Sequence, residues 1–387
     1  MNSKKSILMM IAGAKGTVAS TAAVAAIASR RNPNSVFPFL TTASRFSGSG
    51  IPLELEVAGW DTQETPLAGC IAENGVLPEK VWKPLLQEID CIPVKPAPHR
   101  SSMKTQIEAI AHDIDEFRNQ HPDSQPVFIN LLPACANPEE CSISELADSD
   151  LNIDPSLFPD LAYAAAAVSS GIPVVNFTPN ELETPSVIEE ALLRKVPMAG
   201  RDGKTGQTYF KTVLASSLKA RNLLVDGWYS LNILGNADGM NLMNPQKAAG
   251  KLRNKTALLD EILGYPVGEA YGTSSHKVHI DYYPPRGDAK EAWDVIDIKG
   301  LFGMPMSIRV NLLGRDSVLA APLVIDLTRW AVLLQMAGCA GPVPALGFYF
   351  KKPVGDHPPI TFQEQIDALK SLEARCMESV RKRKSDV

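Results

Sequence analysis

The sequence predicts an α/β protein with a doubly wound parallel sheet of the Rossmann type and an inserted β-rich α+β domain. Three observations carry this prediction. Short apolar runs alternate with helical stretches in the first half of the chain, a glycine turn follows the first run, and closely spaced strands replace this alternation after about residue 208. We therefore expect a nucleotide-binding domain of residues 1–208 and 319–387, and an inserted catalytic and oligomerisation domain of residues 209–318.

The first predicted element is Ser6–Ala12, an apolar run typical of a buried parallel strand. Gly13 and Gly16 follow, and then an alanine-rich helix that Thr17 can cap. A strand, a glycine turn and a helix present free backbone N–H groups and a positive dipole end to a phosphate. The match to G-x-G-x-x-G is incomplete, because Ile11 stands at the first glycine position. Many strand-to-helix turns without a ligand also carry two glycines.

Further strands are predicted within residues 53–61, 127–133, 172–179 and 196–200. In doubly wound sheets the ligand lies beyond the carboxyl ends of the strands, where Asp61, Asn130, Asn176 and the loop of residues 199–208 fall. After the β-rich segment, two long helical stretches begin near Ser317 and Thr361.

The loop "AGRDGKTGQT" at residues 199–208 contains the Gly-Lys-Thr of a P-loop. A P-loop needs a glycine five positions before its Gly-Lys, and Met198 stands there instead. A P-loop is therefore excluded by spacing, although three glycines, a lysine and hydroxyl groups still favour an anion, whose identity the loop alone does not give.

The composition is that of a globular protein, with 387 residues, 45% hydrophobic and 21% charged, and a net charge of −5. This charge gives no reason to expect nucleic acid or a membrane as partner. The six cysteines form no CxxC pair, so we expect reduced thiols and a cytoplasmic protein. His276 and His279 are predicted to lie on a strand, where residues three apart point to opposite faces and do not form a zinc site.

Four further motifs place lysines and carboxylates in loops bounded by proline and glycine: "NILGNADG" from Asn232, "PPRGDAKEAWD" from Pro284, "GRDS" from Gly314 and "FYFKKP" from Phe348. Lysine suits the stabilisation of a developing oxyanion or the binding of a phosphate. Together with the loop of residues 199–208, this ordered set resembles the myo-inositol-1-phosphate synthase (inositol-3-phosphate synthase) family, particularly its shorter bacterial forms. The similarity runs from about Ile7 to Pro353.

The resemblance implies an NAD-dependent isomerase (an intramolecular lyase) that converts glucose 6-phosphate to 1D-myo-inositol 3-phosphate. NAD⁺ would take hydride from C5, a C6 proton would then be lost, and C6 would attack the C1 aldehyde before C5 is reduced again. The resemblance also implies a homotetramer built through the inserted domain. A monovalent or divalent cation is a further candidate, with no ligands identified.

By motif match, Lys251 and Lys351 would act at O5 and Lys290 at O1. The residues expected to hold the substrate phosphate are Lys255, Thr205, Gly206 and Gln207, with Asn232. Those expected to orient the lysines and the substrate hydroxyls are Asp202, Asn236, Asp238 and Asp316. The residues expected to bind the cofactor are Gly13, Ala14, Lys15, Gly16 and Thr17 at the pyrophosphate, Asp61 at the adenosine ribose, and Asn130 and Asn176 at the nicotinamide.

Three alternatives stay open at this point. A sugar-phosphate dehydrogenase would use the same cofactor but would release NADH, and it has no need of several lysines. A non-catalytic NAD-binding protein would not need them either. A diverged cyclase acting on another sugar phosphate would share all the motifs, because they do not report the stereochemistry of the substrate.

Overall fold

The computed structural model describes residues 5–98, 102–134, 159–235, 239–240, 243 and 258–385. Four of the predicted site residues, Asn236, Asp238, Lys251 and Lys255, lie outside these ranges. The chain divides into two compact units, the first being Met1–Gly203, Ala320–Pro358 and Leu369–Val387, and the second Lys204–Leu319 and Pro359–Ala368. The second unit thus begins at Lys204, whereas the sequence predicted its start at residue 209. It also includes Pro359–Ala368, which the sequence had assigned to the first domain.

The first unit is built on a seven-stranded sheet in which all paired strands are parallel. The predicted α/β class with a Rossmann-type sheet is confirmed. The strand order is β11-β6-β5-β4-β1-β2-β3. The strands are β1 (Ser6–Ala12), β2 (Glu54–Asp61), β3 (Val94–Pro96), β4 (Ser124–Asn130), β5 (Val174–Asn176), β6 (Pro197–Gly200) and β11 (Gly341–Pro342).

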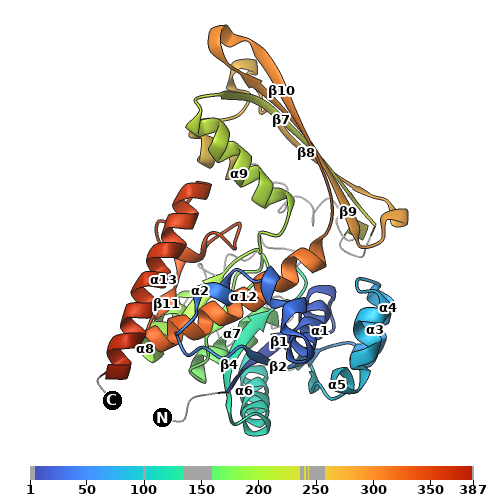
Figure 1. The fold of residues 1–387 in the computed structure, drawn as a ribbon, viewed down its shortest axis with the longest axis vertical. Coiled ribbons are helices and arrows are strands. Elements are labelled where there is room, and N and C mark those ends of the chain that lie inside the picture. The colour runs from blue at the N-terminus through green and yellow to red at the C-terminus, as the bar shows by residue number, and fades with distance from the viewer. Residues whose placement is uncertain are drawn as a thin grey trace. The chain divides into compact units, whose positions relative to one another are not determined.

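Helices cover both faces of this sheet (Figure 1). Strand β1 is buried along its whole length, and its alternate side chains enter two different cores. Ile7 and Met9 pack with side chains of α1, α12 and α13, whereas Leu8 and Met10 pack with those of α6, α7 and α8. The continuous apolar run in the sequence therefore reflects a strand that is covered on both faces.

The α-helices described from end to end are α1 (Thr17–Arg31), α2 (Thr42–Arg45), α3 (Leu67–Asn74), α4 (Glu79–Trp82), α5 (Leu86–Asp90), α6 (Met103–Gln120), α7 (Pro159–Ser169), α8 (Pro185–Arg194), α9 (Gln207–Ala220), α12 (Asp316–Ala337) and α13 (Phe362–Ser385). By length and composition α12 is apolar enough to cross a membrane. However, 78% of its most apolar window is buried, and Val324, Ile325 and Trp330 are part of the core of the first unit. These contacts are those of a core helix.

The second unit contains a four-stranded sheet with the order β10-β9-β7-β8. Its strands are β7 (Leu224–Leu234), β8 (His276–Tyr282), β9 (Ala289–Lys299) and β10 (Pro305–Arg315). The β7–β8 pair is parallel, and the other two pairs are antiparallel. Apolar side chains of α9, among them Ala215 and Leu218, share a core with Trp228 and Ile296 of the sheet. His276 is buried and His279 exposed, as the strand prediction for these two histidines requires.

Candidate functional site

The glycine turn between β1 and α1 has the features of a loop that a phosphate can approach. Gly13 adopts a left-handed conformation with φ of 81°, and a Cβ atom there would lie 2.8 Å from the carbonyl oxygen of Leu131. Only glycine fits both conditions. Helix α1 begins after Gly16 and has no side-chain cap at its N-terminus. A turn with glycine at both ends that leads into an uncapped helix fits a cofactor pyrophosphate.

Two residues assigned to the cofactor bind each other across this turn. The carboxylate of Asp61, at the end of β2, accepts hydrogen bonds from the backbone N–H groups of Lys15, at 2.8 Å, and Gln63, at 3.0 Å. The ammonium group of Lys15 donates to the carbonyl oxygen of Gln63 at 2.5 Å. Asp61 therefore fixes the glycine turn relative to β2. Each carboxylate oxygen has further lone pairs with which it could accept from a ribose hydroxyl.

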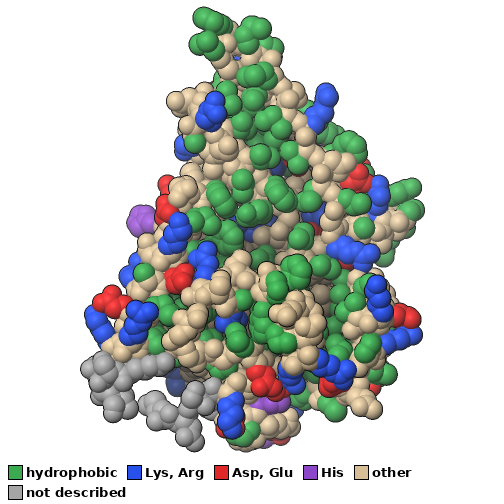
Figure 2. Space-filling model, viewed as in Figure 1, with side chains coloured by type: hydrophobic (Ala, Val, Ile, Leu, Met, Phe, Trp, Pro, Cys, Tyr) green, Lys and Arg blue, Asp and Glu red, His purple; other side chains and the backbone are tan. Residues whose placement is uncertain are grey.

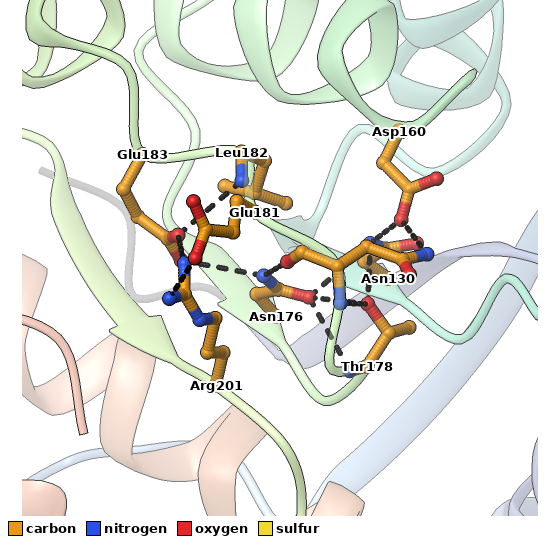
Figure 3. Close-up of polar contacts among 9 residues, drawn as sticks. Asn130, Asp160, Asn176, Thr178, Glu181, Leu182, Glu183 and Arg201 are labelled. Atoms are coloured by element: carbon orange, nitrogen blue, oxygen red, sulfur yellow. Dashed lines mark hydrogen bonds and ion pairs between the residues drawn. The ribbon is translucent and has the colours of Figure 1, made fainter. Parts of the chain in front are cut away.

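Asn130 and Asn176 lie where the sequence placed them, at the carboxyl ends of β4 and β5, and both side chains are fully buried. Figure 3 shows them within a network of protein hydrogen bonds. Asn130 Nδ2 donates to Asp160 Oδ2 at 2.6 Å and to Asn176 Oδ1 at 3.2 Å. Asn176 Nδ2 donates to the carbonyl oxygen of Asn180 at 2.8 Å. Their amides are thus engaged in positioning the strand ends, and direct contact with a nicotinamide stays a prediction.

Sequence reasoning missed the carboxylate at the centre of this network. Asp160 Oδ2 accepts from Asn130 and also from Asn180 Nδ2, at 2.8 Å. Burial raises the pKa of Asp160, although the hydrogen bonds from both amides act in the opposite direction. Asp160 lies at the start of α7, and nothing in the sequence around it gave a sign of this role.

Asp202 and Lys351, predicted to act together, are in direct contact in the first unit. Lys351 Nζ lies 2.7 Å from Asp202 Oδ1, and the backbone N–H of Lys351 donates to the carbonyl oxygen of Asp202 at 2.7 Å. The neighbouring residues Gly203 and Phe350 form an antiparallel bridge. Asp202 has a φ of 60°, and its backbone N–H donates to the carbonyl oxygen of Thr178 at 2.8 Å. These contacts hold a non-glycine residue in a left-handed conformation, which is common at functional sites.

The loop of residues 199–208, expected to hold the substrate phosphate, continues in the second unit, where Gly206 precedes α9 without a side-chain cap. Thr205 Oγ1 lies 3.5 Å from Asp316 Oδ1, and Gln207 Nε2 donates to Asp294 Oδ2 at 3.0 Å. The preceding Lys204, which the sequence analysis did not select, is almost fully buried, and its ammonium group donates to Gln365 Oε1 at 2.7 Å. Thr205, Gly206 and Gln207, three of the five residues expected to hold the phosphate, therefore lie at the N-terminus of a 14-residue helix.

Lys290 and Asp316 form the second lysine–carboxylate pair, with Lys290 Nζ 3.1 Å from Asp316 Oδ2. The side chain of Lys290 is 18% exposed in the second unit, and that of Lys351 is 18% exposed in the first. A carboxylate within hydrogen-bond distance orients an ammonium group.

Asn232 lies on β7 opposite Ala292 of β9, and Lys290 is two residues from Ala292. Since side chains alternate along a strand, Asn232 and Lys290 share one face of the sheet. Asn232 is fully buried, yet neither side-chain amide atom has a hydrogen-bond partner among the described residues. Such an amide is costly unless a ligand satisfies it. Groups of three or more His, Cys, Asp or Glu residues able to hold a metal ion are absent from the part of the chain that the structure describes.

Comparisons with known proteins agree with this geometry. The family model described as "Myo-inositol-1-phosphate synthase" matches residues 206–317. Inositol-3-phosphate synthase 1 of Bacteroides thetaiotaomicron is 33% identical over 386 aligned positions, which cover 90% of this chain and 89% of that protein. A probable inositol 3-phosphate synthase isozyme 3 of Arabidopsis thaliana is 30% identical, with 73% of this chain and 60% of that protein covered.

Two solved structures share the fold. Inositol-3-phosphate synthase of Caenorhabditis elegans matches with a TM-score of 0.77 at 21% identity, covering 97% of this chain and 86% of that one. A myo-inositol-1-phosphate synthase-related protein of Thermotoga maritima matches with a TM-score of 0.73 at 20% identity, covering 96% and 98%. With a relative one-third identical over nearly the full length, and with the lysine–carboxylate pairs of the motifs formed in the structure, this chain belongs to the inositol-3-phosphate synthase family.

Proposed function

We propose that this inositol-phosphate synthase converts glucose 6-phosphate to 1D-myo-inositol 3-phosphate with NAD as cofactor. The observation that carries the proposal is the pair of lysine–carboxylate contacts, Lys290 with Asp316 and Lys351 with Asp202. Both are found at the motif positions through which the sequence resembles the family. A dehydrogenase with net turnover, or a protein that only binds NAD, has no need of two oriented ammonium groups.

NAD fits the first unit, because a turn with Gly13 and Gly16 leads into the uncapped N-terminus of α1 and Asp61 ends the adjacent strand. Bound NAD would supply reversible oxidation of the substrate at C5. A carboxylate at the end of β2 accepts hydrogen bonds from ribose hydroxyls and repels a 2′-phosphate, which favours NAD over NADP. Ala14 of this turn packs in the same apolar core as Ile7, Met9 and Ile11 of β1.

The two lysines would stabilise negative charge on the substrate oxygens. Lys351 would act at O5 while a C6 proton is lost, and Lys290 at O1 while C6 bonds to C1. Each ammonium group is already held by one carboxylate, so that little reorganisation is needed when charge develops. Removal of one such donor typically slows a reaction by about 10²–10³.

The substrate phosphate would bind at the N-terminus of α9, where Thr205, Gly206 and Gln207 lie. The backbone N–H groups at an uncapped helix start and the helix dipole both favour an anion. Asn232, buried on the sheet face that also carries Lys290, is available to a substrate hydroxyl or phosphate oxygen.

We also propose a homotetramer in the cytoplasm. The edge strand β10 alternates between exposed and partly buried residues, and the segment joining it to β9 exposes Leu301, Phe302 and Met304. Figure 2 shows hydrophobic side chains gathered at the upper end of the view, where Figure 1 draws β10 and β7. Exposed apolar surface next to a sheet edge is typical of a face that binds another chain. Sedimentation analysis of the purified protein checks the number of subunits.

The decisive experiment incubates the purified protein with glucose 6-phosphate and NAD⁺ and measures both inositol monophosphate and NADH. We expect inositol phosphate to form while NADH does not accumulate. NADH without a cyclised product would identify a dehydrogenase instead. Inositol phosphate formed from a different sugar phosphate, and not from glucose 6-phosphate, would identify a diverged cyclase.

The lysine variants test the mechanism. Lys290→Met and Lys351→Met should each lower kcat by about 10²–10³. Lys277→Met is the matched control, because Lys277 is an exposed residue of β8 and should keep the parent activity. Parent activity in Lys290→Met would contradict the assignment of this lysine to O1.

A further inference from the structure

A cluster of polar side chains is buried between α9 and the four-stranded sheet, and the reaction proposed above leaves most of it without a role. Each member is at most 7% exposed. The members are Gln207, Lys211, Ser230, His276 and Asp294. A lysine and an aspartate are rarely buried so completely unless they are paired.

Asp294 is the centre of the cluster. Its Oδ2 accepts from Gln207 Nε2 at 3.0 Å, while its Oδ1 accepts from Trp228 Nε1 at 2.7 Å and from Ser230 Oγ at 2.5 Å. One carboxylate oxygen thus holds the first residue of α9, and the other is fixed to the sheet.

Lys211 lies one turn further along α9 and reaches the same strands. Its ammonium group is 3.2 Å from Ser230 Oγ and 2.7 Å from His276 Nε2, and it lies 5.3 Å from the centre of the Trp228 ring. Among the described residues, the titratable groups that face Lys211 are Asp294 from β9 and His276 from β8. Strand β7 contributes only uncharged side chains to these contacts.

The register of the strands places this cluster beside the residues of the proposed reaction. Ser230 is directly opposite Asp294, and Asn232 is opposite Ala292. Lys290, Ala292 and Asp294 alternate along β9 and share the face that α9 covers (Figure 1). The hydrogen bond from Gln207 to Asp294 therefore sets the distance between the helix start and the sheet face that carries Lys290.

We propose that Asp294 positions Gln207 for the substrate phosphate, and that Lys211 neutralises the Asp294 carboxylate so that the phosphate is not repelled. This inference rests on the proposed function, in which Gln207 binds the phosphate of the substrate. A carboxylate so close to a phosphate-binding side chain would weaken anion binding if its charge were not balanced. The buried ammonium group of Lys211 supplies the positive charge that balances this carboxylate.

The charge of Lys211 is sensitive to pH. Burial lowers the pKa of Lys211 from 10.5 to about 8, although the charge of Asp294 acts in the opposite direction. Above this pH the ammonium group loses its proton and the Asp294 charge is no longer balanced. Phosphate binding should therefore weaken as the pH rises through about 8.

The test measures the dissociation constants of inorganic phosphate and of glucose 6-phosphate by calorimetry on the NAD-loaded protein, at about pH 7 and about pH 9.5. For the parent protein we expect binding to weaken on the order of tenfold, beyond any change in the phosphate itself. Lys211→Met should bind weakly at both pH values, and Lys211→Arg, charged throughout, should bind well at both. Lys219→Met, an exposed lysine of the same helix, should keep the parent profile.

A double-mutant cycle tests the positioning role. Asp294→Asn should raise KM more than it lowers kcat, and in a Gln207→Ala background it should add little further loss. Asp297→Asn, an exposed aspartate of the same strand, is the control. Additive effects of Asp294→Asn and Gln207→Ala, or a parent affinity that does not change across this pH range, would overturn the inference. If phosphate binds with the expected profile but no inositol phosphate forms, the proposed reaction fails and the inference stands.

Discussion

Gly13→Ala is the substitution for which the structure gives the clearest expected cost. Gly13 has a φ of 81°, and an alanine in a left-handed conformation costs about 1–2 kcal/mol. Its Cβ would also lie 2.8 Å from the carbonyl oxygen of Leu131. The movement of this carbonyl is limited, because the N–H of the same residue, Leu131, donates a hydrogen bond of 3.0 Å to the carbonyl oxygen of Ala12. Overpacking of this kind costs about 1–3 kcal/mol more.

We therefore expect Gly13→Ala to lose about 2–5 kcal/mol of stability, or to relieve the contact by moving the turn. In either case the turn loses the shape that would accept a pyrophosphate, and the affinity for NAD should fall at least about tenfold. Denaturant titration measures the loss of stability, and fluorescence titration with NADH measures the loss of cofactor affinity.

Gly171→Ala is the matched control, because Gly171 has a φ of 73° but no atom lies within 4 Å of a Cβ placed there. Gly171→Ala should lose only the stability that a left-handed conformation costs an alanine, and it should keep the parent affinity for NADH. Equal losses of stability in the two variants would show that the contact with Leu131 is not restrictive. An unchanged NADH affinity in Gly13→Ala would refute the assignment of this turn to the cofactor.

Three further predictions concern the rest of the site. Gly203→Ala would place a Cβ 2.1 Å from the Phe177 ring, so both the melting temperature and kcat should fall, as calorimetry and steady-state assays would show. Asp202→Asn removes the charged partner of Lys351, and since such hydrogen bonds contribute about 1.5–3 kcal/mol, kcat should fall roughly 10- to 100-fold at saturating substrate. Between pH about 8 and 10.5 the unfolded chain keeps the proton of Lys211, whereas the folded chain has lost it. The free energy of unfolding of the parent should therefore rise with pH in this range, by about 3 kcal/mol relative to Lys211→Met. Denaturant titrations of both proteins across this pH range measure the difference.

The sheet was predictable from the sequence because its strands are buried on both faces and read as continuous apolar runs. The end of β2 at Asp61, of β4 at Asn130 and of β5 at Asn176 follows from the same pattern, since each polar residue directly follows an apolar run. The role of these side chains was not predictable. Whether a buried asparagine faces a ligand or Asp160 depends on residues that are distant in sequence.

The roles of the lysines were also not predictable from residue type alone. Lys204, Lys211, Lys290 and Lys351 all lie in or near the motifs by which the chain resembles the family, and residue type does not separate them. The structure does: Lys204 and Lys211 are buried against protein groups, whereas Lys290 and Lys351 each have a carboxylate partner and a side chain that is partly exposed. An ammonium group at the end of a partly exposed side chain can still meet a developing oxyanion. A buried one acts through its neighbours, and Lys211, next to the carboxylate that holds Gln207, does so beside the proposed phosphate site.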